Sequence, residues 1–172
     1  MTTLVVFYSR TGHTRTLAHQ VANALHAEIE EIDDGVDRRG LFGYLKSVGE
    51  GWFRRRTDIL PSFRDPAAFD LVVIGTPVWR ASLSSPVRAY LCRHAATLPR
   101  VAFFCTMGGF GSDRVFRQMQ EICGKAPLAT LDRHERQLLT HDLADIVDEF
   151  AARLRESLTV QASHAHLHAL ST

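Results

Sequence analysis

Three short runs of the chain are apolar at every position, and they constrain the fold more than any other feature. They read LVVF, LVVI and VAFF. A strand that is apolar throughout buries both of its faces, as strands do in a parallel sheet with helices on each side. With two weaker runs, the sequence predicts five strands, at residues 3–8, 28–32, 70–75, 101–105 and 127–131. The second interleaves glutamates with isoleucines, which is typical of an edge strand.

Apolar stripes with helical spacing lie between the predicted strands. Leu17, Val21 and Leu25 follow the first strand, and similar stripes follow the third, fourth and fifth. Strands that alternate with helices predict an α/β doubly wound sheet with helices on both faces. We expect one domain over residues 1–158. Residues 159–172 have little core pattern and are expected to form a flexible tail.

One segment, residues 38–56, does not fit this alternation. It reads RRGLFGYLKSVGEGWFRRR, with apolar residues on one helical face and a strongly basic remainder. We interpret it as an excursion between the second and third strands. It is predicted either to fold over the sheet edge or to contact a partner or an anionic membrane surface. No apolar run approaches the length of about 20 residues that a membrane-spanning helix needs.

Charge and cysteine content narrow the functional classes. The formal net charge of the 172-residue chain is +1, which does not favour a nucleic-acid-binding protein. The three cysteines are odd in number, and their spacing fits neither a zinc site nor a disulfide framework. Reduced thiols in a cytoplasmic protein are therefore expected.

The first predicted strand ends in a hydroxyl-rich loop, YSRTGHT, that leads into a helical pattern. Backbone N–H groups and the helix dipole favour an anion at such a place, and Ser9, Thr11 and Thr14 add hydroxyl donors. Gly12 allows a tight turn close to the ligand. The loop has no lysine, and neither GxxxxGK[ST] nor GxGxxG occurs in it. A single phosphate monoester fits such a loop, although a helix capped by a Ser/Thr-rich turn explains it equally well.

Two further strand ends suggest what the phosphate belongs to. The third strand continues into GTPVW and the fourth into TMGGFG. Since the carboxyl ends of parallel strands meet at one edge of a sheet, all three loops should lie together. A large aromatic residue, Trp79, and a glycine-rich backbone beside a phosphate loop suit a flat, conjugated ligand with a phosphate tail.

The loop Ser-Arg-Thr-Gly-His-Thr, with the GTPVW and GG loops, resembles the flavodoxin-like FMN-binding family in its short-chain form. The resemblance implies a five-stranded parallel sheet in the order 2-1-3-4-5 and FMN as the cofactor. By resemblance, the phosphate is held by Ser9, Arg10, Thr11, Gly12, His13 and Thr14. The isoalloxazine is flanked by Thr76, Pro77, Val78 and Trp79, and by Thr106, Met107, Gly108, Gly109, Phe110 and Gly111.

The resemblance implies electron transfer and leaves two functions open. One is NAD(P)H-dependent reduction of quinone-like or other small acceptors, and the other is a flavodoxin-type carrier between redox partner proteins. Typical flavodoxins are strongly acidic, and this chain is not, which favours the reductase. The loop at residues 76–83 has no glycine, so we expect it to avoid positive φ and to favour two-electron transfer. No side chain suits an acid, base or nucleophile, so we predict neither a catalytic residue nor a metal site.

Overall fold

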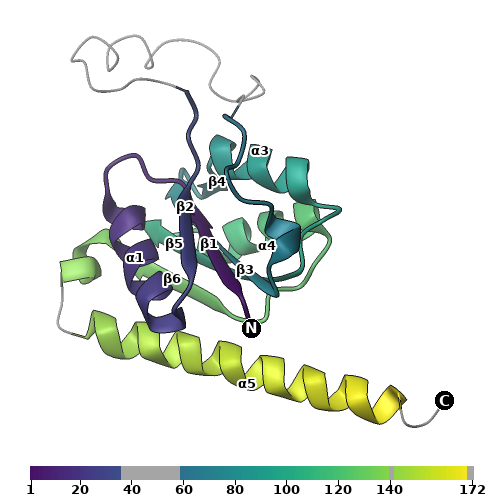
Figure 1. Ribbon diagram of the computed structural model, residues 1–172. Helices are drawn as coiled ribbons and strands as arrows, with labels where there is room; N and C mark the ends of the chain where they lie inside the picture. The colour runs from purple at the N-terminus through teal and green to yellow at the C-terminus, as the bar shows by residue number, and fades with distance from the viewer. Residues whose placement is uncertain (36–58, 140–141, 170–172) are drawn as a thin grey trace.

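The computed structural model describes residues 1–35, 59–139 and 142–169 as a central sheet between two layers of helices (Figure 1). The predicted excursion at residues 38–56 lies outside the described residues. The strands are β1 (Thr3–Phe7), β2 (Glu28–Glu31), β3 (Leu71–Trp79), β4 (Ser82–Leu83), β5 (Arg100–Met107) and β6 (Thr130–His134). The helices are α1 (His13–Leu25), α3 (Ser85–His94), α4 (Ser112–Cys123) and α5 (Leu143–Ala169), with 3-10 turns η1 (Pro66–Ala68) and η2 (Glu135–Leu139).

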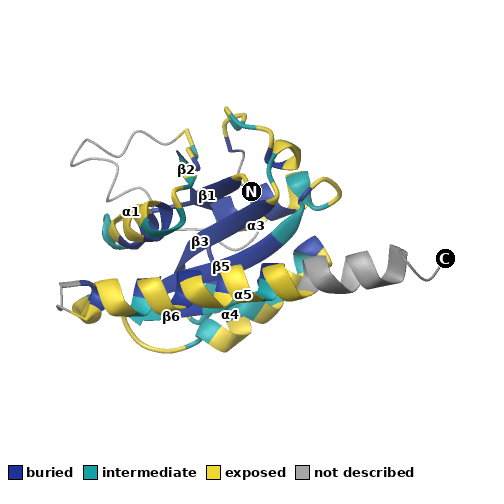
Figure 2. Cartoon of the chain, turned by 60° about the horizontal axis from the view of Figure 1, so that its bottom comes forward, coloured by how far each residue is buried: buried dark blue, intermediate teal, exposed yellow. Residues whose placement is uncertain are grey.

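Five strands are parallel, in the order β2-β1-β3-β5-β6, and the short β4 pairs antiparallel with the end of β3. This confirms the predicted α/β doubly wound sheet, whose order 2-1-3-4-5 corresponds to the observed order once β4 is set aside. Alternate residues of each strand face opposite layers. Leu4 and Val6 pack with α3 and α4, whereas Val5 and Phe7 pack with α1 and α5. The three central strands β1, β3 and β5 are buried on both faces over most of their length (Figure 2), as their apolar sequences predict.

Gly75 in β3 leaves room for an aromatic ring of the core. It pairs with Phe104 on β5, and the Phe104 side chain lies across the glycine. A Cβ atom at Gly75 would lie 2.0 Å from Cζ of Phe104, far inside contact distance. The absence of a side chain at this position is therefore a packing requirement of the sheet.

The third strand is longer than predicted. β3 runs past Gly75 to Trp79, because residues 76 and 77 continue the ladder with β5 and the next two residues pair with β4. Pro77 has no N–H group to donate to a neighbouring strand. It is tolerated here because β1 pairs with β3 only as far as Gly75, so no strand lies where that N–H would point. The predicted loop of residues 76–79 is thus a strand end.

The fifth strand was predicted too early. β6 spans Thr130–His134 instead of residues 127–131, although Leu128 already donates its N–H to Val101 on β5. β6 is the second edge strand, and in it only Leu131 is buried. Its polar remainder, Asp-Arg-His, does not show an apolar strand pattern.

The opposite edge, at β2, is covered by residues 59–64. Leu60 donates its N–H to the Asp33 carbonyl at 2.9 Å. The Glu30 carboxylate, 8% exposed, accepts the N–H groups of Phe63 and Arg64 at 2.9 and 3.1 Å. The predicted edge position of this strand is confirmed, and the edge is closed by the chain itself.

The last helix extends beyond the predicted domain boundary. Buried side chains of α5 continue to Leu158, whereas Val160 is exposed. The helical backbone nevertheless reaches Ala169. The expected tail is thus helical as far as this residue. Residues 159–169 contain no glycine or proline, and adding residues to an existing helix needs no new nucleation. Flexibility of this end stays a prediction.

Candidate functional site

The loop after β1 is organised around one hydroxyl. The Oγ atom of Ser9 accepts the N–H groups of Gly12 and Arg15, each at 3.2 Å. Gly12 has φ of 96° and is the N-cap of α1. The N–H groups of His13 and Thr14, in the first turn, have no intrahelical acceptor. The loop therefore directs helix N-terminal donors outward from the carboxyl edge of the sheet, where an anion is favoured.

A buried pair of hydroxyls links this loop to β5. Thr14 Oγ1 and Thr106 Oγ1 lie 2.8 Å apart, and the two residues are 1% and 2% exposed. A hydroxyl donates one hydrogen bond and accepts two. When Thr106 donates to Thr14, the Thr14 proton is free for an acceptor outside the pair. The predicted phosphate contact of Thr14 is therefore compatible with this geometry and stays a prediction.

A residue that the sequence did not suggest lies beside the same loop. Glu135 begins η2, directly after β6, and its Oε1 is 3.3 Å from Nδ1 of His13. That nitrogen is also 3.2 Å from Oγ1 of Thr11. A Cβ atom at Gly108 would lie 4.0 Å from Oε2 of Glu135, so η2 borders the loop after β5 as well. A strand prediction that ended at residue 134 would have revealed Glu135 as a strand-end residue.

The β3–β4 turn has a conformation that the sequence did not predict. Trp79 pairs with Ser82, so Arg80 and Ala81 form a two-residue hairpin turn. Their φ values are 49° and 54°. The expectation that a glycine-free loop avoids positive φ was wrong. Left-handed backbone costs a residue with a side chain about 1–2 kcal/mol, so surrounding contacts must hold this turn in place.

Those contacts come from the loop after β5 and from α4. Gly111, the N-cap of α4, has φ of 113°, and a Cβ atom there would lie 2.6 Å from Cβ of Ala81. The two backbones therefore pack directly against each other. At the base of the hairpin, Thr76 Oγ1 and Ser84 Oγ lie 2.9 Å apart, and both residues are fully buried.

Two aromatic residues occupy different environments at this edge. Trp79 is half-buried and meets Tyr8 edge-on, with ring centroids 5.8 Å apart. Phe110 is 83% exposed in the loop after β5. Met107 is buried at the end of β5, level with His134 of β6. Of the two rings, that of Phe110 is therefore the more accessible to a ligand or partner.

The single buried thiol near the site is inert. Cys105 is fully buried in β5, and this burial, with the Asp132 and Asp113 carboxylates, raises the pKa of its thiol well above its usual range. The thiolate form needed for nucleophilic or redox chemistry is therefore disfavoured. Cys105 therefore serves the packing of the sheet.

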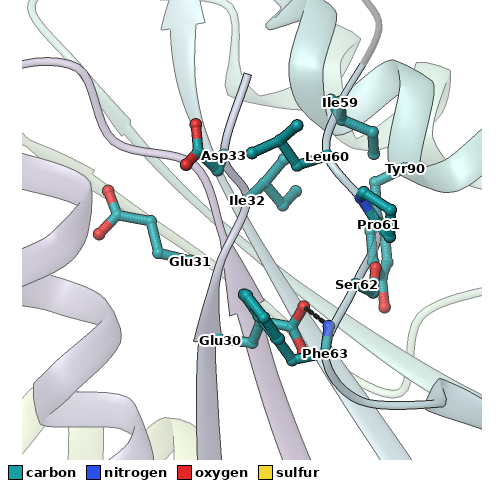
Figure 3. A pocket seen from close by; sticks show the side chains of 10 residues that line it. All are labelled: Glu30, Glu31, Ile32, Asp33, Ile59, Leu60, Pro61, Ser62, Phe63 and Tyr90. Atoms are coloured by element: carbon teal, nitrogen blue, oxygen red, sulfur yellow. Dashed lines mark hydrogen bonds between the residues drawn. The ribbon is translucent and has the colours of Figure 1, made fainter. Parts of the chain in front are cut away.

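A separate small pocket lies at the covered β2 edge and is lined by residues of β2, α3 and the segment that follows residue 58 (Figure 3). Figure 3 shows the Glu30 carboxylate joined to the backbone N–H of Phe63. Tyr90 also lines it; its hydroxyl is buried and has no hydrogen-bond partner among the described residues. The carboxylate at this pocket is engaged in holding the edge segment, so we assign the pocket a structural role.

The predicted site residues thus come together at one edge. Residues 9–14 follow β1, residues 76–79 end β3, and residues 106–111 span the end of β5 and the turn into α4. Direct contacts connect the first loop to β5 and the hairpin to the α4 N-cap. Helix N-terminal donors on one side and exposed aromatic and glycine-rich surface on the other suit a phosphate monoester carrying a flat ring.

Comparison with solved structures settles which fold this is. A flavoprotein from Lactobacillus acidophilus, solved in complex with FMN, has a TM-score of 0.61 at 19% identity; the match covers 76% of this chain and 92% of that one. The chain has the flavodoxin-like fold. Two-electron-reduced flavodoxin from Megasphaera elsdenii has a TM-score of 0.57 at 18% identity, covering 90% of this chain and 98% of that one.

A further flavodoxin-like neighbour comes from Agrobacterium tumefaciens. This flavodoxin, a WrbA-like protein, has a TM-score of 0.56 at 14% identity and covers 92% of this chain and 98% of its own. No protein-family model matches the sequence, and no curated protein is similar to it. In the described parts of the chain, no helix is both long and apolar enough to cross a membrane.

Proposed function

We propose that this flavodoxin-like chain binds FMN at the carboxyl edge of its sheet and uses it to reduce quinone-like or other small acceptors with NAD(P)H. The observation that carries the proposal is the convergence of the three strand ends, with helix donors beside the first and aromatic residues beside the others. The FMN-bound neighbour from Lactobacillus acidophilus supports it.

The residues at this edge fit FMN in their chemistry. The loop that Gly12 turns offers N–H and hydroxyl donors to a phosphate, with no side chain filling the space beside Gly12 within 4 Å of a Cβ position. Trp79 and Phe110 offer ring faces, and the backbones of Gly108 and Gly109 offer donors to a ring edge. FMN supplies the redox chemistry when bound, whereas the chain binds, orients and shields it. The negative charge of Glu135 would repel a phosphate. His13, whose Nδ1 lies 3.3 Å from the Glu135 carboxylate, offsets that charge when its imidazole is protonated.

The alternative is a carrier that exchanges electrons with redox partner proteins. One observation favours it: the β3–β4 turn already has positive φ at Arg80 and Ala81. The steric argument for two-electron transfer is therefore weaker than the glycine-free sequence suggests. Exposed Phe110 is also suited to a protein contact, since aromatic residues are enriched in interfaces.

Two measurements test the proposal in sequence. The flavin-free chain is first titrated with FMN and with riboflavin, and FMN is expected to bind more tightly because only FMN carries the phosphate. Absence of FMN binding would remove both functions. The FMN-loaded chain is then mixed anaerobically with NADH or NADPH and afterwards with a benzoquinone. Reduction of the flavin by either nucleotide, followed by its rapid reoxidation by the quinone, supports the reductase. A flavin that neither nucleotide reduces contradicts the reductase and favours the carrier.

The cellular location is part of the proposal. Cys92, Cys105 and Cys123 are all free, and the last two are buried. Free thiols are usual in the reducing cytoplasm, which supports a cytoplasmic protein. Contact of residues 38–56 with an anionic membrane surface or a partner stays a proposal that rests on sequence alone.

A further inference from the structure

Gln118 connects α4 to the β3–β4 hairpin. Its Oε1 accepts the N–H of Leu83 at 3.0 Å and lies 3.5 Å from Oγ of Ser82. Both contacts use the side-chain oxygen of Gln118 as an acceptor. β4 has only two residues, so the Leu83 N–H is satisfied by this helix rather than by another strand.

The hairpin needs such support because of its own backbone. Arg80 and Ala81 hold left-handed conformations that their side chains disfavour. Ala81 rests against Gly111, whose missing side chain makes the approach possible. Gly111 and Gln118 are seven residues apart along α4, which is about two helical turns, so they lie on the same face of the helix. α4 therefore holds the turn at two points, one through packing and one through hydrogen bonds.

We propose that Gln118 is a positioning residue for the cofactor site. By holding the β3–β4 turn against Gly111, it fixes the two loops that flank the ring site relative to each other before the cofactor binds. Trp79 precedes the turn and Phe110 precedes Gly111, so the same contact sets the separation of both aromatic residues. The positioning of the cofactor rests on the proposed FMN function, whereas the anchoring of the turn stands without it.

The test compares three variants, of which one removes the Gln118 acceptor, one keeps it and one removes an acceptor elsewhere on the helix. Gln118→Met keeps an unbranched side chain of similar length and removes the acceptor. Gln118→Glu keeps an oxygen that accepts the same hydrogen bonds. Gln120→Met makes the identical chemical change at an exposed position of the same helix and serves as the control. Amide hydrogen exchange of Leu83 is measured in the flavin-free chain, and FMN affinity and the two one-electron reduction potentials are measured in the loaded chain.

Loss of the Leu83 hydrogen bond should speed exchange of that amide by on the order of fivefold in Gln118→Met. FMN affinity should fall by a similar factor of about fivefold, and the separation of the two potentials should change. Gln118→Glu and Gln120→Met should stay within about twofold of the unmodified chain in each measurement.

Any other result counts against the proposal. Unchanged Leu83 exchange in Gln118→Met refutes the anchoring. Faster exchange with unchanged FMN affinity and potentials refutes the positioning role, because the turn is then loosened without consequence for the cofactor. Failure of Gln118→Glu to keep both properties near those of the unmodified chain refutes the role of the acceptor oxygen. If the unmodified chain does not bind FMN, the proposed function fails, while the exchange measurement still decides whether Gln118 anchors the turn.

Discussion

Replacing Gly75 with alanine should destabilise the sheet through a clash with one ring. The new Cβ would lie 2.0, 2.3 and 2.6 Å from Cζ, Cε2 and Cε1 of Phe104. Carbon atoms in contact normally stay about 3.5–4.0 Å apart, so the ring has to move by about 1.5 Å. Phe104 is 0% exposed and packed on all sides, which leaves it no free space to move into.

The expected cost follows from these distances. Overpacking a core typically costs about 1–3 kcal/mol, and a clash this severe belongs at the upper end. Alanine in a strand is favoured over glycine by roughly 0.5–1 kcal/mol, which offsets part of it. The free energy of unfolding should fall by about 2 kcal/mol, which corresponds to a Tm lower by roughly 4–8 °C for a domain of this size.

Urea unfolding of the flavin-free chain, followed by circular dichroism, measures this difference. Gly109→Ala is the matched control, since its φ is not positive and a Cβ there meets nothing within 4 Å; its effect should stay within about 0.5 kcal/mol. Combining Gly75→Ala with Phe104→Leu should show a coupling of at least about 1 kcal/mol, because the smaller side chain relieves the clash. Equal stability of the two alanine variants, or strict additivity in the double variant, would refute the packing argument.

Three further predictions concern the site and the chain ends. Thr14→Ala should weaken FMN about tenfold, from loss of a charge-assisted hydrogen bond, and leave riboflavin nearly unaffected; equal weakening in calorimetric titrations would exclude a phosphate contact. Ala81→Gly should raise the free energy of unfolding by about 1 kcal/mol, because glycine tolerates the positive φ. The control Ala152→Gly, on the exposed face of α5, should lower the free energy of unfolding by about 1 kcal/mol. A lower free energy of unfolding in both variants would show that Ala81 is unstrained. Hydrogen bonds from Thr2, first the backbone N–H and then the hydroxyl, lower the pKa of the Asp70 carboxyl, so its contribution to stability is present above the unfolded pKa and is lost as pH falls through the lower folded value. The stability difference between Asp70→Asn and the unmodified chain should therefore shrink in denaturation curves below about pH 4, and a constant difference would contradict this.

The sequence predicted the sheet well because burial leaves a strong pattern. Strands buried on both faces, such as β1 and the first half of β3, must be apolar at every position. Their order followed from resemblance, and the placement of the three loops followed from the parallel arrangement. Edge strands are harder to predict, because only one face is buried. β6 was displaced by three residues for this reason.

The site details that were missed depend on contacts between distant segments. Glu135 is distant in sequence from His13, and nothing local in either segment suggests that they meet. The left-handed turn at Arg80 and Ala81 contradicts the local preference of both residues. It is held by Gly111 and Gln118, more than 25 residues further along the chain. Tertiary contacts override local propensity here, and a single sequence does not display them.

The covered β2 edge has a consequence for how molecules of this chain associate. An open edge strand offers unpaired N–H and C=O groups on which a strand of another molecule can assemble. Here the two oxygens of Glu30 hold the covering segment at Phe63 and Arg64, and Arg64 also pairs with Glu28. Resistance to aggregation on this side thus depends on the contacts that hold this segment, and a substitution that detaches it would expose a template for intermolecular sheets.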